Sequence, residues 1–301
     1  MIQRQIDAAS LRWPGLEFKR KTRDEASSAC PFCAQADTDG FLIFAAGNYW
    51  CRKCGIRGWI DENQPREVDA NKLLEARIAE LERKQREQDE RLSALERMHK
   101  CTDHLAYHRY LESHPELMDY WLYEGITTDS IIHYKLGYCH ACPTYQASPS
   151  YTIPVVNRGK LENIRHRLVM PGKAGKYRPH MSGLGSVLFN VDTLDAAQER
   201  IVVVEGEKKS IVAAQTGIAN VGICGQRTFN RAWLPWFSRV QDVIFALDPD
   251  AMESSYVLAR LFGGRARVAS LPRKIDDMIA KDGATRSDLE AFFRVARPVA
   301  A

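Results

Sequence analysis

The chain has 301 residues, of which 45% are hydrophobic and 27% charged, and its formal net charge is +4 at pH 7. This composition is typical of a globular protein with room for two or three domains, and it excludes a fully disordered chain. Because the net charge is small, local clusters of charge must indicate any partner. The longest apolar runs are strand-sized and residues 1–10 lack the apolar block of a signal peptide, which predicts a cytoplasmic protein without membrane spans.

Two cysteine pairs form the first motif along the chain. Cys30 and Cys33 are two residues apart, as are Cys51 and Cys54, and 17 residues lie between the pairs. This spacing places two thiolates on each of two tight turns, so it predicts a structural Zn²⁺ site. Such a small unit needs the ion for its stability. Cys139 and Cys142 also have metal-ligand spacing, but no second pair follows, so we interpret them as packing or turn residues.

The segment around these cysteines interleaves cations with aromatic residues. Residues 40–50 are typical of a hairpin with its turn at Gly47, and Phe41 or Phe44 is expected to point inward. Phosphates pair with cations while bases stack on rings, so this pattern favours single-stranded nucleic acid. The unit either binds nucleic acid or only stabilises the fold. The residues concerned are Phe18, Lys19, Arg20, Lys21, Arg23, Phe41, Phe44, Tyr49, Trp50, Arg52, Lys53, Arg57 and Trp59.

Residues 61–97 are rich in Glu, Arg, Lys, Gln and Leu and contain no glycine, which predicts a long helix. Its apolar seam is interrupted by Gln85 and Gln88, which argues against a strong coiled coil. Three roles stay open for it: a semi-rigid spacer, weak self-association through residues 67–97, or a helix docked on its own protein. The seam consists of Leu74, Ile78, Leu81, Leu92 and Leu95.

Helices are expected over residues 101–138, with a break at Gly125 and with Thr128 or Asp129 capping the next helix. The candidate core residues are Tyr107, Tyr110, Leu111, Trp121 and Leu122.

A hairpin is predicted from residues 151–156 and 161–168, followed by a basic block. Residues 158–178 hold seven Lys and Arg against one acid. Arg165 and Arg167 alternate onto one face of a strand, and Lys176 and Arg178 lie in a basic loop, so both groups suit a phosphate backbone. A solvated basic face is the alternative. The GxxxxGK[ST] pattern is absent, so no helicase motor is expected.

Acidic residues follow the apolar runs of the last third of the chain. Glu205 follows residues 201–204, and Asp248 and Asp250 follow residues 242–247, with a helix expected at 210–216. Such runs predict buried parallel strands, and ligands gather beyond their carboxyl ends. Asp276 and Asp277 follow a further strand at 267–271. Carboxylates gathered at one edge repel one another unless a cation such as Mg²⁺ or Mn²⁺ lies among them.

The order Val-Glu-Gly-Glu, helix, Leu-Asp-Pro-Asp resembles the TOPRIM domain of primases, topoisomerases and some nucleases. The segment from Tyr49 to Trp59 is similar to the zinc-binding domain of phage primases, and residues 121–138 resemble the start of the primase polymerase domain. The resemblance implies that Glu205, Asp248 and Asp250 are catalytic and hold the metal.

The resemblance also implies that Asp276 or Asp277 joins the metal, without choosing between them. It places template and primer contacts on Arg167, Lys176 and Tyr177. Many bacterial primases have an acid where this chain has Lys209, and phage and mobile-element proteins are the closer relatives in this respect. Lys208 and Lys209 contact triphosphate or are ordinary surface lysines.

We therefore expect an α/β fold with a mostly parallel TOPRIM sheet, a small amino-terminal zinc-ribbon β domain and a long helical linker. The expected domains are a zinc ribbon at 1–64, a linker at 65–100, a helical and basic part at 101–196 and the TOPRIM domain at 197–301.

The function implied is that of a DNA primase from a phage or mobile element, which joins ribonucleoside triphosphates on a single-stranded DNA template and works beside a separate replicative helicase. Three rivals are a TOPRIM nuclease, a topoisomerase, for whose extra domains there is little room, and a catalytically silent nucleic-acid-binding factor.

Overall fold

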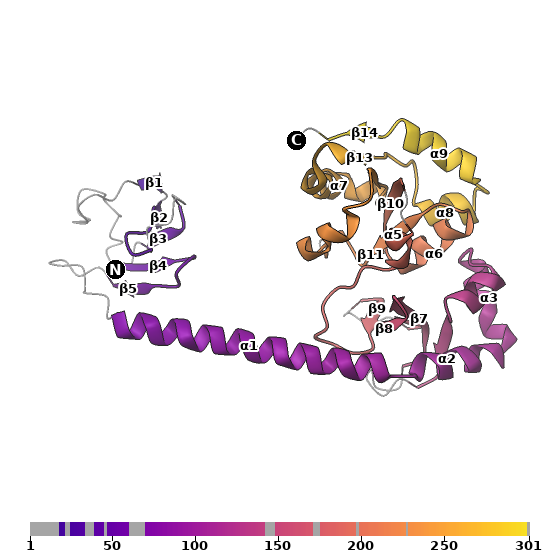
Figure 1. Cartoon of the computed structure of the whole chain (residues 1–301), viewed down its shortest axis with the longest axis horizontal. Helices are drawn as coiled ribbons and strands as arrows, with labels where there is room; N and C mark the ends of the chain where they lie inside the picture. The colour runs from indigo at the N-terminus through magenta and orange to yellow at the C-terminus, as the bar shows by residue number, and fades with distance from the viewer. Residues whose placement is uncertain are drawn as a thin grey trace. The chain divides into compact units, whose positions relative to one another are not determined.

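The computed structural model describes residues 18–21, 25–33, 39–44, 47–59, 70–141, 148–170, 175–196, 199–226 and 228–299. The chain divides into two compact units, Met1–Glu87 and Gln88–Ala301 (Figure 1). The division falls inside one helix, α1 (Ala70–Lys100), and the domain boundaries expected at residues 64, 100 and 196 stay predictions. No helix within the described ranges is both long and apolar enough to cross a bilayer.

The first unit is built on a five-stranded antiparallel sheet in the order β1-β2-β3-β4-β5. The predicted hairpin is confirmed, since β3 pairs with β4 and the Gly47 amide donates to the Phe44 carbonyl over 2.8 Å. Phe41 is fully buried, whereas Trp50 and Trp59 are exposed. The side chains of residues 18–24, including the expected cations Lys19, Arg20, Lys21 and Arg23, lie outside the described part. The strands are β1 (Phe18–Lys21), β2 (Glu25–Ser28), β3 (Phe41–Phe44), β4 (Asn48–Cys51) and β5 (Arg57–Trp59).

The long helix predicted between the two sheets is confirmed as α1. Its seam residues Leu74, Ile78 and Leu81 are about half exposed. Farther along, Ala94 and Met98 are buried in a cluster with Leu161, Ile164 and Leu184. The carboxyl-terminal turns of α1 are therefore docked on their own protein, as one of the three interpretations requires.

Three short helices follow, α2 (Asp103–Glu112), α3 (Pro115–Tyr123) and α4 (Thr128–His133). Leu111 and Trp121 are fully buried as predicted, but Leu122 is exposed, because it lies on the outer face of α3. The cap prediction was also wrong: Thr127 is the N-cap of α4, and its side chain accepts a hydrogen bond from the Ser130 amide. Three consecutive capping-type residues leave the sequence unable to say which adopts the extended conformation.

The predicted basic hairpin is confirmed within a four-stranded antiparallel sheet of order β6-β7-β8-β9. Arg158 and Gly159 have positive φ values of 49° and 73°, which suits the tight turn between β7 and β8. Because β8 is regular there, Arg165 and Arg167 share one face of it. The strands are β6 (Gly137–Cys139), β7 (Ser150–Asn157), β8 (Lys160–Leu168) and β9 (Tyr177–Pro179).

The α/β prediction is confirmed by a second five-stranded sheet, of order β11-β10-β12-β13-β14. Its first four strands are parallel, and β14 pairs antiparallel with β13 at the edge. Val203 and Val204 of β10 enter different hydrophobic clusters, so the strand is covered on both faces as its apolar run predicted. The strands are β10 (Arg200–Glu205), β11 (Asn220–Ile223), β12 (Asp242–Phe245), β13 (Ala266–Val268) and β14 (Arg297–Pro298).

Helices cover the two faces of this sheet (Figure 1). One face packs on η2 and α7 through Phe237 and Leu258, and the other packs on α8 and α9 through Met278 and Phe293. The helical elements are α5 (Asp192–Asp195), α6 (Glu207–Gln215), α7 (Met252–Ala259), α8 (Ile275–Ala280), α9 (Arg286–Arg294) and the 3₁₀ segments η2 (Arg231–Phe237), η3 (Pro249–Ala251) and η4 (Arg260–Arg265).

Candidate functional site

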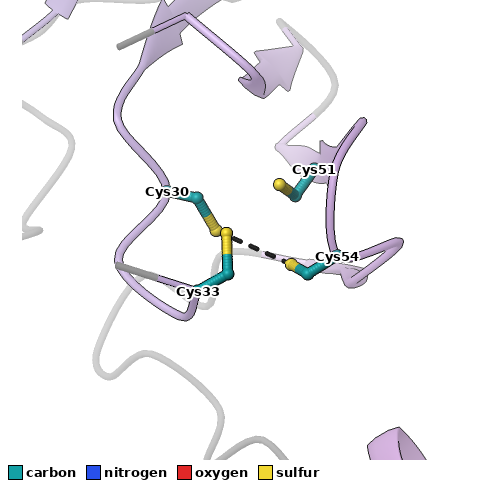
Figure 2. Close-up of side chains that lie close together, drawn as sticks. All are labelled: Cys30, Cys33, Cys51 and Cys54. Carbon is teal, nitrogen blue, oxygen red and sulfur yellow. Dashed lines mark hydrogen bonds between the residues drawn. The ribbon is translucent and has the colours of Figure 1, made fainter. Parts of the chain in front are cut away.

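The four cysteines of the first unit converge on one point. Their sulfur atoms all lie within 4.8 Å of one another, and Cys30 and Cys54 are 3.8 Å apart. Figure 2 shows Cys30 and Cys33, from the turn after β2, facing Cys51 at the end of β4 and Cys54 in the turn before β5. All four are free thiols. The predicted ligand set is therefore brought together in the structure.

The chemistry of this cluster suits a metal ion. Burial raises the pKa of Cys30 and of Cys54 above the ordinary value. Burial also acts to raise the pKa of Cys51, but the backbone amides of Cys54 and Lys53 outweigh it and lower that pKa. Four sulfur donors at this spacing match a closed tetrahedral zinc site, where the ion makes all four thiolates stable together.

A cleft of about 460 Å³ lies at the carboxyl ends of the parallel strands. Glu205 ends β10, Asp248 follows β12, and Asp276 lies in the first turn of α8, after β13. Arg167, Arg178 and Asp250, although predicted for the same site, do not line it. The lining residues are Arg165, Lys176, Tyr177, Glu205, Gly206, Glu207, Lys208, Lys209, Cys224, Asp248, Lys274, Asp276 and Asp277.

Gly206 forms the turn that presents Glu205, and Gly222 of β11 lies against it. Gly206 has a φ of +92°, which suits glycine, and its amide donates to the Ile223 carbonyl over 2.6 Å. A Cβ on Gly222 would lie 2.8 Å from the Gly206 carbonyl oxygen. Gly206 therefore provides the positive φ of the turn, whereas Gly222 lets β11 approach because a side chain there would collide with the Gly206 carbonyl.

Asp248 is already paired with two lysines. The Lys209 ammonium lies 2.7 Å from its Oδ1, and the Lys274 ammonium lies 3.4 Å from its Oδ2. The Asp248 residue is only 7% exposed, so these pairs compensate a carboxylate that has lost most of its water. Lys209, which departs from the resemblance, thus lies where a cation is needed.

Lys208 bridges two further acids. Its ammonium lies 2.7 Å from Asp276 Oδ2 and also contacts a carboxylate oxygen of Glu124. Although burial opposes the shift, Asp276 and Glu124 raise the pKa of Lys208. The other oxygen of Asp276 is buried and has no hydrogen-bond partner within the described residues. Asp277 instead pairs with Lys281 over 2.7 Å. Of the two acids, Asp276 is therefore the one that contacts Lys208.

The predicted basic side chains are held beside the cleft by acids. Arg165 Nε lies 3.0 Å from Glu207, and Arg167 lies 3.4 Å from Glu124. The Arg167 guanidinium also lies over the Tyr120 ring, 4.6 Å from its centroid. These pairs position the arginines, and β9 supplies Tyr177 and Arg178 next to them.

Glu205 differs from its neighbours because it forms no ion pair within the described residues. Burial raises its pKa, and Asp248 and, more weakly, Asp250 raise it further. The carboxylates of Glu205, Asp248 and Asp250 do not lie within 4.8 Å of one another as a set of three, and Asp250 is exposed on η3. The structure thus places Glu205, Asp248, Asp276 and Asp277 in the cleft, whereas Asp250 does not line it.

Four residues of this network were not predicted as site residues: Glu124, Glu207, Cys224 and Lys274. Glu207 and Lys274 each lie within two residues of a predicted acid, and this proximity could have identified them as site residues. Glu124 is 84 positions from Lys208, so no local pattern connects them. Burial and then Glu207 raise the pKa of Cys224 to about 12, and its thiol donates to Glu207 over 3.2 Å.

Comparison with known proteins shows similarity in structure only. No family model matches the chain, and no curated protein matches it in sequence. The zinc-binding and RNA polymerase domains of the Aquifex aeolicus primase match 94% of this chain and 81% of that one, at 17% identity and a TM-score of 0.54. The chain has the fold of the bacterial primases.

Two further primase structures support the same fold. The RNA polymerase domain of the Mycobacterium tuberculosis primase matches 70% of this chain and 84% of that one, at 16% identity and a TM-score of 0.55. The E. coli primase catalytic core matches 67% and 80%, at 16% identity and a TM-score of 0.54. Because the Aquifex match covers nearly the whole chain, the primase fold includes the cysteine-bearing sheet as well as the parallel sheet.

Proposed function

We propose that this protein is a DNA primase that joins ribonucleoside triphosphates into short RNA on single-stranded DNA. One observation carries the proposal: in a primase fold, acids from the ends of three parallel strands meet cationic side chains in one cleft. The reaction proposed is attack of a ribonucleotide 3′-hydroxyl on the α-phosphate of the next triphosphate, with pyrophosphate leaving. The same fold and motifs support the TOPRIM assignment of the parallel-sheet domain.

The acids of the cleft fit a divalent cation, Mg²⁺ or Mn²⁺. Burial and Asp248 raise the pKa of Glu205, and one oxygen of Asp276 is buried without a partner, so a cation would relieve both. We assign the ligands to Glu205, Asp248 and Asp250, with Asp276 rather than Asp277 as the further acid. When bound, the ion would neutralise charge on the triphosphate.

The protein's own side chains would do the rest. A carboxylate with a raised pKa suits proton acceptance, so Glu205 would take the proton of the attacking hydroxyl. Lys208 and Lys209 lie at the start of α6 and would hold triphosphate oxygens. The template–primer duplex would lie along β8 and β9. The side chains assigned to it are Arg165, Arg167, Lys176, Tyr177 and Arg178.

The partners proposed are single-stranded DNA and a separate replicative helicase. The polymerase domain of the Mycobacterium tuberculosis primase has been solved in complex with a double-stranded DNA oligomer that carries a 6-nucleotide overhang. In this chain, Trp50 and Trp59 are exposed on the cysteine-bearing sheet and suit base stacking. The four-cysteine set supports a phage or mobile-element origin, and the exposed seam of α1 leaves weak self-association through residues 67–97 as part of the proposal.

The test is synthesis of labelled oligoribonucleotides on single-stranded DNA with Mg²⁺ or Mn²⁺. Glu205→Gln and Asp248→Asn should each lower the rate at least about 100-fold, because each removes a charged group of the reacting centre. Glu116→Gln is the matched control, since Glu116 is exposed on α3, outside the cleft. Products from wild type that persist in both cleft variants would contradict the proposal.

The Lys209–Asp248 pair favours one second candidate, a nucleic-acid-binding factor without catalysis. The reason is that Lys209 occupies a position where many bacterial primases have an acid. Single-stranded DNA binding without any RNA product would identify it. Cleavage of plasmid DNA with Mg²⁺, lost in Asp248→Asn, would instead indicate a nuclease.

A further inference from the structure

A second group of metal-binding side chains lies in the Gln88–Ala301 unit, outside the cleft. Ligand atoms of Cys101, Asp103 and His180 all lie within 4.8 Å of one another. They come from separate elements: Cys101 directly follows α1, Asp103 opens α2, and His180 follows β9. The connection between α1 and α2 is thus brought together with the residue after β9, with sulfur, oxygen and nitrogen donors.

The imidazole of His180 is oriented as metal-binding histidines usually are. Its Nε2 lies 3.3 Å from Asp103 Oδ2, while its Nδ1 is hydrogen bonded to His166 Nε2 over 3.0 Å. His166 is in turn hydrogen bonded through Nδ1 to the Ser150 hydroxyl over 2.8 Å, and both residues are fully buried. A hydrogen bond on the second ring nitrogen fixes the tautomer and the ring orientation of a ligand.

The spacing also agrees with a shared ion. Bonds of about 2.0–2.3 Å in a tetrahedral zinc shell place neighbouring donor atoms about 3.3–3.8 Å apart. The 3.3 Å between His180 and Asp103 already has this value, and the third donor lies within 4.8 Å. Small side-chain rotations would complete the shell. The Asp103 side chain is 50% exposed, which leaves an entry path and room for a water as fourth ligand.

We propose that Cys101, Asp103 and His180 bind a second zinc ion, separate from the four-cysteine site. The donor set selects the metal, because thiolate and imidazole suit Zn²⁺, whereas Mg²⁺ and Ca²⁺ prefer oxygen alone. The alternative is an ordinary ion pair between Asp103 and His180, with the Cys101 thiol hydrogen bonded to the Asp103 amide, and metal analysis distinguishes the two.

The ion would fasten the end of α1 to the hairpin that carries the basic side chains. His99, in the last turn of α1, lies 3.5 Å from Glu162 of β8, and the His180 amide donates to the Ile164 carbonyl over 2.7 Å. A zinc ion at Cys101 and His180 adds a bond of much greater strength to the same junction. We therefore expect loss of the ion to loosen the α1–β8 contact.

The experiment measures zinc in the purified full chain by mass spectrometry. Wild type should hold about two ions per chain, and the Cys30→Ser, Cys33→Ser double variant about one. Cys101→Ser and His180→Gln should also hold about one. Cys224→Ser is the matched control and should keep both ions, since Cys224 is a half-buried cysteine outside both ligand groups.

Cobalt provides a readout that does not depend on retention of zinc during purification. The Cys30→Ser, Cys33→Ser variant, stripped of metal and titrated with Co²⁺, should develop thiolate-to-cobalt absorption. That band should vanish when Cys101→Ser is added, while circular dichroism shows the helices intact. A wild type whose zinc is lost entirely with Cys30 and Cys33, together with no cobalt band, overturns the second site. So does a Cys101→Ser variant with the metal content and spectrum of its parent.

Discussion

The cysteine cluster of the first unit and the acidic cleft of the second differ in how their negative charge is compensated. Both gather groups that carry negative charge when ionised. In the cluster, the neighbours of each sulfur are other sulfurs and backbone amides. In the cleft, ammonium groups of Lys208, Lys209 and Lys274 already lie against Asp276 and Asp248.

The difference concerns what each region needs in order to fold. A cluster of thiolates without a counterion is stable only with metal, so binding and folding are one event there. The cleft is compensated by lysines, so it can fold without a divalent ion and exchange one during turnover. Permanent structural metal and transient catalytic metal thus have different surroundings, and three experiments test this distinction.

The largest expected effect is removal of metal from the cysteine cluster. Cys30→Ser with Cys33→Ser, or a strong chelator, should unfold the β1–β5 sheet, because apparent zinc-binding free energies are about 10–16 kcal/mol. Hydrogen exchange should rise in residues 25–59 and stay unchanged in β10–β13. Cys224→Ser serves as the control for loss of a thiol. If hydrogen exchange after metal removal stayed as slow in residues 25–59 as in β10–β13, the proposed difference between the two regions would be contradicted.

An intermediate effect is expected at Lys209. Lys209→Ala leaves Asp248 with only the longer Lys274 contact, so the free energy of unfolding without divalent ions should fall by about 3 kcal/mol. Mn²⁺ should restore much of this loss, and the variant should bind Mn²⁺ more tightly than wild type by calorimetry. Lys281→Ala, which removes an exposed pair with Asp277, should leave the free energy of unfolding nearly unchanged. A Lys209→Ala variant indifferent to Mn²⁺ would show that the lysine does not compete with metal.

The smallest effect concerns pH and Glu205. Burial, followed by Asp248, raises the pKa of this carboxyl above its ordinary 4.5. A pKa raised by folding means that the stability contribution is full below about the unfolded value and is lost as the pH rises through the folded value. Glu205→Gln should therefore raise the Tm relative to wild type at pH 7, and the difference should shrink below pH 4.5. Scanning calorimetry at both pH values measures this difference in Tm between the variant and wild type. Mg²⁺ should reduce the difference at pH 7. An equal difference at both pH values would refute the assignment.

The sequence predicted those parts of the molecule that depend on short spacing. Paired cysteines, the hairpin of β7 and β8, and acids after apolar runs are local patterns, and parallel pairing carries Glu205 and Asp248 to one edge. The role of Glu124 could not be predicted from the sequence, because its contact with Lys208 depends on how α3 packs near α6.

Helical phase limited the prediction in the same way. Neighbouring residues on a helix point about 100° apart, so only the structure shows that Asp276, and not Asp277, contacts Lys208. The same holds for Leu122, whose neighbour Trp121 is buried instead. The approach of His180 to Cys101 and Asp103 likewise depends on tertiary contacts that no spacing encodes.

The short final strand has a consequence for the behaviour of the sheet in a crowded cell. β14 consists of Arg297 and Pro298, and it pairs antiparallel along β13. Proline has no amide hydrogen to donate, and a charged arginine disfavours stacking of a further chain. Arg297 and Pro298 thus make this edge strand a poor partner for strands of other chains. A truncation before Arg297 would leave β13 as an open edge, and we expect such a protein to precipitate more readily even with its cleft intact.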